Sequence, residues 1–268
     1  MLNLTHYKKV RLPFSDSSPK LPSSINGSNS MWRTVLICLL VSALVACATQ
    51  KGTVQTGDSS GSLTADERAA GWQPLFDGRT TAGWRGYKSD AVPAGWHVVD
   101  GTLTKSVGTG DLVSLDQFGN FELAFDWMLG PEGNAGVFFR GTEEYDHIYW
   151  SAPEYQLLDD SLAPDGKSRL TAAGSAFAVY PAPAGIVKPA GQWNSSMIVV
   201  RGAHVEHWMN GTKLLEYELW SHDWEARVKG SKFRAWPNYG LAKRGYIGIQ
   251  GDHDGVLSLR NIRIRQLP

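Results

Sequence analysis

The sequence predicts an all-β fold: an antiparallel two-sheet sandwich of the jelly-roll type with one or two short helices. Short segments in which apolar and polar residues alternate are separated by Gly, Asp and Asn through residues 71–268, a pattern typical of strands joined by tight turns. Roughly a dozen such strands fit into about 200 residues, which favours two packed antiparallel sheets. A helical bundle or a parallel sheet with crossover helices is not supported.

Two hairpins have the strongest local signals. Asp100-Gly101 and Asn210-Gly211 each separate two apolar segments, and both dipeptides favour two-residue turns. The strands are predicted at residues 96–99, 102–104, 121–127, 136–140, 154–158, 196–200, 205–209, 213–219, 246–250 and 256–264.

One helix is predicted, over residues 221–232. Ser221 is the expected N-cap, with acidic residues in the first turn and lysines near the end, as the helix dipole favours. In the last strand the apolar alternation shifts between Leu259 and Ile262, which predicts a β-bulge near Asn261.

The N-terminal region resembles a bacterial lipoprotein signal. Residues 31–47 (MWRTVLICLLVSALVAC) contain one cation, Arg33, and an apolar stretch too short to span a bilayer comfortably. The stretch ends in Leu44-Val45-Ala46-Cys47, which resembles the lipobox whose cysteine is acylated. Ala48 follows the cysteine, and the absence of Asp there favours the outer membrane. An ordinary signal peptide or a signal anchor is the alternative.

This leader divides the chain into three parts. Residues 1–46 are expected to be an upstream extension and signal peptide, residues 47–70 a flexible tether, and residues 71–268 one globular domain. We expect the protein in the bacterial cell envelope, anchored to the membrane through lipid on Cys47 and facing the periplasm. Both cysteines, Cys38 and Cys47, precede the domain, which can therefore form no disulfide and offers no thiol nucleophile.

The charge distribution excludes one class of partner. The chain has 268 residues with 26 basic and 26 acidic side chains. The first 46 residues hold five basic groups and one acidic group, so residues 47–268 hold 21 basic and 25 acidic groups. A nucleic-acid-binding domain normally carries a basic excess or a basic stripe, so nucleic acid is not an expected partner. No oligomeric state is predicted.

Strand parity predicts a polar set on one face of a sheet. If Val137, Tyr155 and Ile249 point into the core, their sequence neighbours point to the opposite face. That face then carries Phe138, Arg140, Glu154, Gln156 and Gln250. Polar side chains that converge at mid-strand positions are typical of binding clefts. A solvated sheet face with an Arg–Glu ion pair is the alternative interpretation.

Two histidines lie in segments that could carry chemistry. His207 lies in a predicted strand, where a hydrogen-bonded structural histidine is the commoner role. His253 lies in the loop 250–255 (QGDHDG) between two aspartates, one of them Asp252. That loop could supply a base with a carboxylate partner, a site for a hard metal ion, or a simple turn.

Motifs of several large enzyme classes are missing. The chain has no GxSxG, HExxH, Walker A or dinucleotide-binding fingerprint. Among its many tryptophans, Trp150 and Trp208 are candidates to stack on the apolar face of a sugar ring.

Ordered motifs along residues 71–267 resemble one family. The match begins with Gly71-Trp72-Gln73-Pro74-Leu75-Phe76-Asp77-Gly78 and Gly83-Trp84 and continues through residues 96–103, 121–123, 133–140, 154–159, 188–194, 207–211, 239–240, 248–250 and 260–262. The order and number of these matches identify the chain as similar to the DUF1080, or 3-keto-disaccharide hydrolase, family. The resemblance implies a sandwich of the concanavalin A-like lectin/glucanase type.

The chain departs from the family pattern at two positions. A commoner version has Q-D-H-G at the last site, whereas this chain has one inserted residue in Gln250-Gly251-Asp252-His253-Asp254. Gln192 replaces the usual Glu before Trp193. The insertion bears directly on the placement of His253.

The resemblance implies action on 3-keto sugars. A ketone at C3 acidifies the hydrogen on C2, so a base can form an enolate and the C1 substituent can leave by elimination. Water can then add across the double bond. Such a site needs a base near C2, an electrophile near the C3 oxygen and an acid for the leaving oxygen, and it needs no carboxylate pair of the usual glycosidase type.

The roles implied by this resemblance are as follows. His253 is the expected base, and Asp252 would orient it or bind metal. Arg140 is expected to stabilise the enolate, Glu154 to act as acid, base or metal ligand, and His207 to be a second proton donor. The expected partners of sugar hydroxyls are Asn134, Gln156, Lys188 and Gln250. A divalent ion such as Ca²⁺, held by Glu154 and Asp252, could replace or assist Arg140.

Two other functions remain open at this point. A non-catalytic glycan-binding lipoprotein would use the same fold, since fold does not imply function, and would bind unoxidised glycans. A conventional β-glucanase would need two essential carboxylates, and the Glu-x-Asp-x-x-Glu pattern of some glucanases is absent. The expected partner in every case is a carbohydrate.

Overall fold

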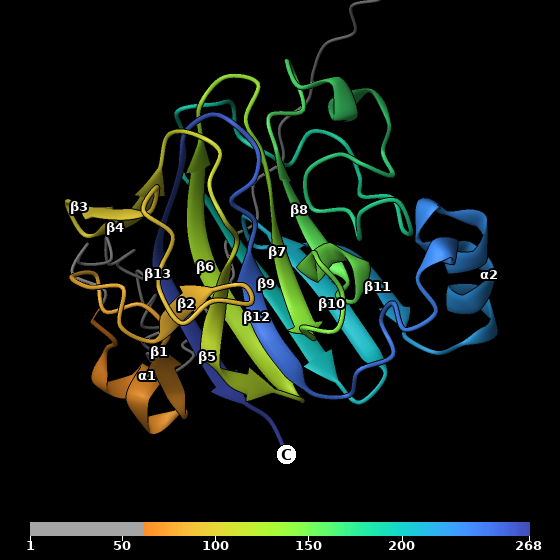
Figure 1. Ribbon diagram of the computed structural model, residues 1–268, viewed down its shortest axis with the longest axis horizontal. Coiled ribbons are helices and arrows are strands. Elements are labelled where there is room, and N and C mark those ends of the chain that lie inside the picture. Colours follow the sequence, from red (N-terminus) through yellow and green to blue (C-terminus); the bar gives the residue numbers. More distant parts are fainter. Residues whose placement is uncertain (1–61) are drawn as a thin grey trace, which may run out of the picture. The chain divides into compact units, whose positions relative to one another are not determined.

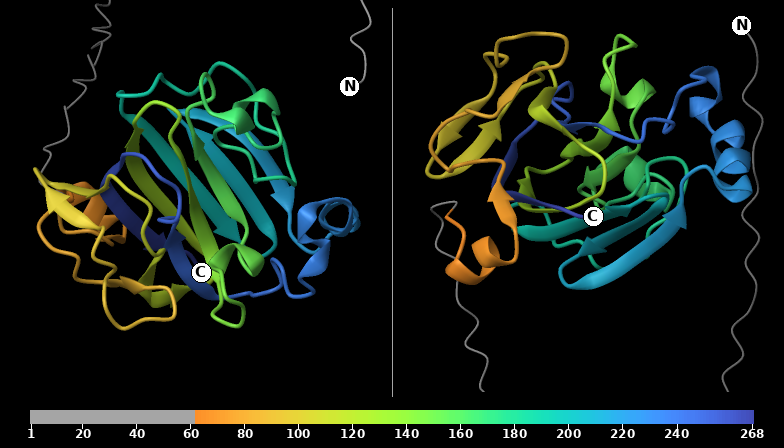
Figure 2. Two further views of the ribbon diagram at one scale, coloured as in Figure 1. Left: turned by 45° about the horizontal axis from the view of Figure 1, so that its top comes forward. Right: turned by 90° about the horizontal axis from the view of Figure 1, so that it is seen from below.

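The computed structural model describes residues 62–268, which form two antiparallel β-sheets stacked face to face (Figures 1 and 2). The larger sheet runs in the order β11 (Thr212–Glu218), β10 (His204–Met209), β9 (Asn194–Arg201), β6 (Phe121–Leu129), β13 (Leu257–Gln266), β4 (Thr102–Lys105) and β3 (His97–Val99), and β1 (Trp72–Pro74) also pairs with β13. The smaller sheet runs in the order β2 (Trp84–Gly86), β5 (Leu112–Phe118), β12 (Gly245–Ile249), β7 (Asn134–Gly141) and β8 (Glu154–Leu158). The predicted jelly-roll sandwich is confirmed.

The main hydrophobic core lies between the two sheets. Alternate side chains of the smaller sheet enter it, and these are Val137, Phe139, Tyr155, Leu157, Ile247 and Ile249. The predicted parity is therefore correct for β8 and β12, and for β7 as far as Phe139. Their other side chains point to the outer face of this sheet, where a second, smaller cluster forms around Val113, Phe138 and Ile148.

Both predicted hairpins have left-handed turn residues. Asp100 and Gly101 have φ of 47° and 76°, and Asn210 and Gly211 have φ of 50° and 80°. Two consecutive positive φ values are the signature of a type I′ turn, which Asn-Gly and Asp-Gly tolerate best. The turns place β3 against β4 and β10 against β11.

The predicted bulge in β13 is also confirmed. Its register against β6 shifts between Arg260 and Arg263, and Asn261 has φ of 53°. The extra residue lets Leu259 and Ile262 both reach the core, which explains why the apolar alternation changes parity there.

The predicted helix at residues 221–232 is confirmed as α2 (His222–Gly230). The hydroxyl of its N-cap, Ser221, accepts a hydrogen bond from the Trp224 amide, and Trp224 is the buried residue of the helix. Three 3₁₀ turns lie in the segments that connect the strands: η1 (Ile148–Trp150), η2 (Pro164–Lys167) and η3 (Lys232–Ala235).

The ordered fold begins before residue 71. A short helix, α1 (Ala65–Ala69), lies inside the segment expected to be tether, with a capping box between Thr64 and Glu67. Leu63 is buried and Arg263 of β13 forms an ion pair with Glu67, so these residues pack on the domain. Residues 64–67 (TADE) are a capping-box signal. The small and polar residues that precede them are instead typical of a flexible tether.

The predicted signal peptide and Cys47 lie outside the described residues. Between residues 62 and 268, no helix is long and apolar enough to cross a membrane.

Candidate active site

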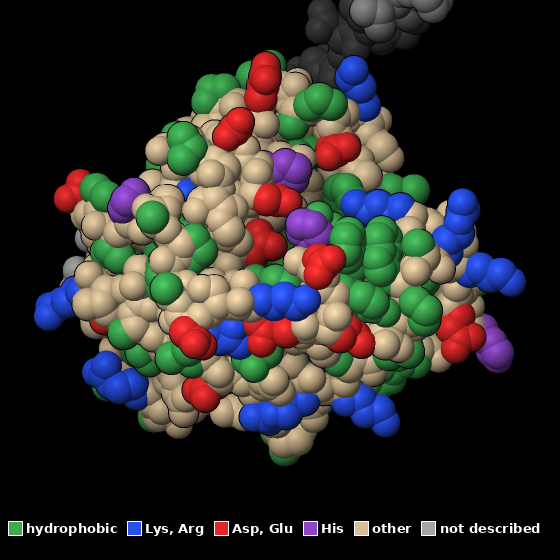
Figure 3. Space-filling model, in the orientation of Figure 1, with side chains coloured by type: hydrophobic (Ala, Val, Ile, Leu, Met, Phe, Trp, Pro, Cys, Tyr) green, Lys and Arg blue, Asp and Glu red, His purple; other side chains and the backbone are tan. Residues whose placement is uncertain are grey.

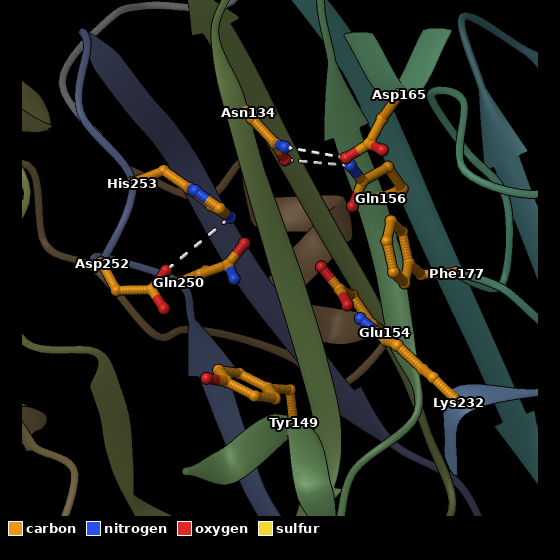
Figure 4. A pocket seen from close by; sticks show the side chains of 10 residues that line it. All are labelled: Asn134, Tyr149, Glu154, Gln156, Asp165, Phe177, Lys232, Gln250, Asp252 and His253. Atoms are coloured by element: carbon orange, nitrogen blue, oxygen red, sulfur yellow. Dashed lines mark hydrogen bonds and ion pairs between the residues drawn. The ribbon is translucent and has the colours of Figure 1, made fainter. Parts of the chain in front are cut away.

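A polar pocket of about 350 Å³ opens on the outer face of the smaller sheet. In Figure 3, acidic and histidine side chains gather around a hollow near the middle of this face. Figure 4 shows the residues that line it: Asn134, Tyr149, Glu154, Gln156, Asp165, Phe177, Lys232, Gln250, Asp252 and His253. They come from β7, β8, the loop after β12, and the segments that cover the sheet.

Six of the residues predicted from the sequence meet in this pocket. They are Asn134, Glu154, Gln156, Gln250, Asp252 and His253. The alternative of a solvated sheet face is wrong, because Glu154, Gln156 and Gln250 are only 4%, 1% and 6% exposed. The polar set lies at the bottom of a cavity that a ligand of sugar size can enter.

A glycine makes room for Glu154 on the pocket floor. Gly136 pairs with Gln156 across β7 and β8, and Phe138 pairs with Glu154. A β-carbon built on Gly136 would lie 2.2 Å from Oε1 of Glu154. The carboxyl group therefore extends across the bare backbone of β7, and only glycine permits this position.

Burial changes the ionisation of Glu154. The pKa of this carboxyl group is raised to about 8, chiefly by desolvation; the charge of Lys232 opposes this rise, and the charges of Asp252, Asp111 and Asp165 add to it. A carboxyl group in such surroundings is mostly protonated at neutral pH. Glu154 can therefore donate a proton from the pocket floor, as general acids with raised pKa values do.

The opposite wall is the loop that carries Asp252 and His253. His253 Nε2 lies 3.9 Å from Asp252 Oδ1, and the imidazole is 45% exposed. Figure 4 shows the His253 ring and the Glu154 carboxyl group on different sides of the cavity, with Gln250 between them. A substrate in the cavity would thus have an imidazole and a carboxyl group on different sides.

Backbone contacts hold this loop in place despite the inserted residue. The Gly251 amide donates to Asp111 Oδ1 at 2.7 Å and the Gly251 carbonyl accepts from the Thr109 amide at 2.9 Å. The Gly108 amide donates to Asp254 Oδ1 at 2.9 Å. The loop is thereby tied to the strand-connecting segment before β5.

Lys105 and Asp111 are buried charges under the loop, and sequence reasoning missed both. Lys105 is 1% exposed and its Nζ donates to the carbonyls of His253 and Gly255 at 2.5 and 3.3 Å. Burial raises the pKa of Asp111 to about 6 and lowers the pKa of Lys105. Both groups support the backbone around His253 without entering the pocket.

Gln250 offers an unused hydrogen-bonding atom to the cavity. Its backbone amide donates to the Gly136 carbonyl at 2.9 Å, which fixes the residue beside the floor. Its side-chain Oε1 is buried and has no hydrogen-bond partner among the described residues. A buried polar atom without a partner is costly, and a bound hydroxyl group would satisfy it.

Four lining residues were not predicted: Tyr149, Asp165, Phe177 and Lys232. All four lie in 3₁₀ turns or loops, where no periodicity indicates which way a side chain points. The Lys232 ammonium lies over the rings of Phe177 and Phe233, 4.2 and 5.2 Å from their centroids, and forms no ion pair within residues 62–268. It is a cation available to a ligand.

The prediction that Arg140 lies at the site is wrong. Arg140 has φ of 52° and lies where the β7–β12 register shifts, so the alternation that holds for Phe138 does not extend to it. Its Nε donates to the Gly119 carbonyl at 3.0 Å and its guanidinium lies 5.6 Å from the Trp220 ring. These contacts hold it at the β5–β6 connection, away from the pocket.

The prediction that His207 donates a proton at the site is also wrong. His207 is fully buried in the core, and its Nδ1 donates to the Gly174 carbonyl at 2.9 Å. Its ring packs 4.8 Å from that of Tyr155. Burial lowers its pKa to about 4, so the ring is a neutral structural group, the commoner role considered above.

Three other predicted ligand contacts do not line the pocket. The Lys188 amine donates to the Trp193 carbonyl, and the Trp208 indole donates to Glu206 on the larger sheet. The Trp150 ring stacks on Trp236 at 5.0 Å; it follows Tyr149 in η1 but does not reach the cavity.

The pocket carboxylates do not form a ready-made metal site. Among residues 62–268, the group of three ligand-type side chains with atoms within 4.8 Å of one another is His204, Glu206 and Glu216. That group lies on the larger sheet, and Lys213 already forms ion pairs with Glu206 and Glu216. Asp252 and Glu154 do not belong to it.

Comparisons with known proteins agree with one another. Residues 71–265 match the family model described as the 3-keto-alpha-glucoside-1,2-lyase-like domain. A protein of Bacteroides thetaiotaomicron named 3-keto-disaccharide hydrolase is 34% identical over 280 aligned positions, which cover 86% of this chain and 96% of that protein.

Two solved structures are also similar to this chain. A presumed glycosyl hydrolase of Parabacteroides distasonis is 33% identical with a TM-score of 0.73, covering 78% of this chain and 99% of that one. A second such structure from the same organism is 27% identical with a TM-score of 0.60, covering 73% and 99%.

Proposed function

This chain belongs to the 3-keto-alpha-glucoside-1,2-lyase-like family of glycoside-cleaving enzymes, and we propose that its substrates are 3-keto-glycosides, including 3-keto-disaccharides. The observation that carries the proposal is the composition of one pocket. A protonated carboxyl group, Glu154, and an accessible imidazole, His253, line the same cavity. Elimination from a 3-keto sugar requires an acid and a base of this kind at neighbouring carbons.

His253 is the proposed base. It removes the proton from C2, and the electron pair of the C2–H bond moves toward C3 to give an enolate. Asp252, 3.9 Å away, stabilises the imidazolium that forms. The position of the loop is fixed by Lys105 and Asp111 beneath it, so the ring does not depend on a flexible segment for its placement.

Glu154 is the proposed acid. As the C1–O bond breaks, its electron pair goes to the leaving oxygen, which takes the proton of Glu154. The product is a sugar with a C1=C2 double bond conjugated to the C3 ketone. In hydration, water adds at C1 and gives a proton to the Glu154 carboxylate, while imidazolium returns a proton to C2. The two groups are then in their starting states.

Lys232 takes the role expected of Arg140. Its ammonium lies beside Glu154 at the pocket wall (Figure 4) and forms no ion pair within the described residues, so it can stabilise negative charge on the C3 oxygen. Gln250 Oε1, which has no partner among those residues, and Asn134 are placed to accept and donate hydrogen bonds with sugar hydroxyls. Phe177 offers an aromatic face to the ring.

No step of this mechanism passes through a metal ion, because the pocket carboxylates do not converge on one point. A divalent ion such as Ca²⁺ remains a proposal for a site completed by substrate oxygens, with Asp252 as the protein ligand. Hard cations bind such oxygen sets. Dialysis against a chelator, followed by turnover with and without added Ca²⁺, tests it.

We also propose that the protein is a lipoprotein of the cell envelope, attached through Cys47 and facing the periplasm from the outer membrane. The lipobox-like end of the leader supports this. Incorporation of labelled palmitate that is lost in Cys47→Ala tests the attachment, and fractionation of the two membranes tests the location.

The decisive experiment compares a glucoside with its 3-keto derivative. The purified protein is expected to cleave the keto sugar and leave the parent intact, and Glu154→Gln should remove most of the cleavage. Cleavage of the parent sugar alone would point to a conventional β-glucanase. Binding of the parent without any turnover of the keto sugar would point to a glycan-binding protein.

A further inference from the structure

Four side chains form a row along the wall of the pocket, and hydrogen bonds join three of them: Asp165, Asn134 and Gln156. Asn134 Nδ2 donates to Asp165 Oδ2 at 3.2 Å, and Gln156 Nε2 donates to Asn134 Oδ1 at 3.0 Å. The other end of the Gln156 amide lies 3.0 Å from Glu154 Oε1. Figure 4 shows Asn134 joined to both Asp165 and Gln156, with Glu154 on the same strand as Gln156.

The direction of this row is fixed at its Asp165 end. A carboxylate only accepts hydrogen bonds, whereas an amide donates at one end and accepts at the other. Asn134 must therefore turn its NH₂ group to Asp165 and its oxygen to Gln156. Gln156 must then turn its NH₂ group to Asn134, which leaves its own oxygen 3.0 Å from Glu154 Oε1 and 3.3 Å from the Ala135 carbonyl oxygen.

Two oxygen atoms 3.0 Å apart form a hydrogen bond only when one of them carries a proton. In this arrangement that proton belongs to Glu154, which donates it to the Gln156 oxygen. If Glu154 ionises, Gln156 gains by turning its NH₂ group to the carboxylate, where Ala135 O at 3.3 Å would accept a second bond. Asn134 must then turn as well and place its oxygen against Asp165, so that two acceptors face each other.

This conflict lies between Asn134 and Asp165, which are both half-buried, so water can relieve part of it. The centre of the row has no such relief. Gln156 is 1% exposed, so its amide has only protein partners in the empty pocket, and an unsatisfied buried polar atom costs about 1–3 kcal/mol. We propose that Asp165 is a positioning residue: acting through Asn134 and Gln156, it holds a carbonyl oxygen against Glu154 and so keeps that carboxyl group protonated. This inference rests on the proposed role of Glu154 as the acid.

Burial is the largest cause of the protonation of Glu154, and direct charge repulsion is the competing explanation for any contribution of Asp165. The charged groups that act on Glu154 are Lys232, Asp252, Asp111 and Asp165, of which Lys232 favours the ionised carboxylate and the three aspartates oppose it. Tyr149 and His253 also line the pocket. Among the aspartates, Asp252 acts more strongly through space than Asp165. Charge alone therefore predicts that Asp252→Asn lowers the proton affinity of Glu154 more than Asp165→Asn does.

The test measures the protonation of Glu154 itself, without substrate. Protein labelled with ¹³C at the glutamate carboxyl carbons is titrated by NMR, and the Glu154 signal is assigned by its absence in Glu154→Gln. With Asp165→Asn, residue 165 can donate as well as accept, so both amides can turn. We expect this change to lower the proton affinity of Glu154 by about tenfold, or one pKa unit, and by more than Asp252→Asn does.

Asn134→Ala provides a second variant that keeps the charge of Asp165 but breaks the row. It is expected to lower the proton affinity of Glu154 as Asp165→Asn does, and the double variant should add little. No change in Asn134→Ala, or a larger effect in Asp252→Asn than in Asp165→Asn, would overturn the proposal. Because the titration needs no turnover, these outcomes are independent of whether 3-keto-glycosides are the substrates.

Discussion

The carboxyl group of Glu154 lies directly over the α-carbon of Gly136, on the neighbouring strand. A β-carbon at position 136 would approach Oε1 to 2.2 Å and Cδ to 2.8 Å. The position of the proposed acid is therefore determined by the absence of a side chain on β7. A glycine inside a strand normally weakens a sheet. Here its missing side chain leaves the space that the buried carboxyl group of Glu154 occupies.

Gly136→Ala is expected to displace Glu154 and to reduce turnover of a 3-keto-glycoside about 100-fold or more, the usual contribution of general acid catalysis. The overpacked sheet should lose about 1–3 kcal/mol of unfolding free energy. Steady-state kinetics and urea unfolding measure the two effects. Gly230→Ala is the matched control, because a β-carbon there meets nothing within 4 Å. Normal activity in Gly136→Ala would mean that Glu154 need not occupy this position.

The raised pKa of Glu154 predicts a basic limit to activity. With a pKa of about 8, the carboxyl group loses its proton above that pH, so the rate of cleavage should fall as the pH rises through 8. Glu154→Gln should remove most of the activity and this limb with it. A pH–rate profile for kcat checks the prediction, and a basic limb that persists unchanged in the residual activity of Glu154→Gln would assign it to another group.

The same pKa has a consequence for stability. Glu154 has a pKa of about 8 when folded and near 4.5 when exposed, so between these values the folded protein binds a proton that the unfolded chain has released. Stability should therefore fall as the pH rises from 4.5 through 8. Asp111, with a pKa of about 6, acts in the same direction over a lower range. The urea midpoints of wild type and Glu154→Gln are compared from pH 5 to 9, and their difference gives the contribution of Glu154 to the pH dependence of stability. A difference that stays constant with pH would contradict the prediction.

Much of the pocket could be predicted from the sequence because strand alternation is regular in β8 and β12. Glu154, Gln156 and Gln250 lie on the face opposite to Tyr155 and Ile249, as parity requires. Arg140 does not follow this rule, because its own backbone has φ of 52° and this left-handed conformation interrupts the alternation. No composition or spacing in the sequence marks that left-handed residue.

His207 shows the opposite case. Val205, His207 and Met209 alternate on β10 and are all buried, so the strand pattern itself placed the histidine with core residues. Lys232 and Asp165 could not be predicted by any such rule, since each lies in a 3₁₀ turn that reaches the pocket only through tertiary packing. The fold, the two hairpins and the bulge depend on local signals, whereas the complete site depends on how loops cover the sheet.

Lys105 is expected to control the position of His253 from below. Lys105→Met keeps the length of the side chain but leaves the carbonyls of His253 and Gly255 without their buried donor, which should cost about 1–3 kcal/mol. A loop shifted by about 1 Å can reduce the rate about 100-fold. Kinetics, with hydrogen exchange of residues 251–255, should report both effects. Lys88→Met is the control, because its ion pair with Asp146 is exposed and exposed pairs contribute little. Equal effects of the two substitutions would contradict the role of Lys105.

The separate roles of His253 and Glu154 can be distinguished by isotope exchange. A 3-keto sugar dissolved in D₂O with the enzyme should exchange its C2 hydrogen for deuterium whenever the base forms the enolate and returns a proton before the leaving group departs. Proton NMR of the C2 position follows this step independently of cleavage. Glu154→Gln is expected to retain exchange while most of the cleavage is lost, because only the departure of the C1 oxygen needs the acid.

His253→Ala is expected to lose both reactions, with exchange reduced about 100-fold or more, because it removes the group that takes the C2 proton. The imidazole is 45% exposed, so the substitution should leave the urea midpoint unchanged and a loss of exchange cannot be attributed to unfolding. Exchange at the wild-type rate in His253→Ala would remove His253 from the mechanism. Loss of exchange in Glu154→Gln in proportion to cleavage would instead assign the base to Glu154.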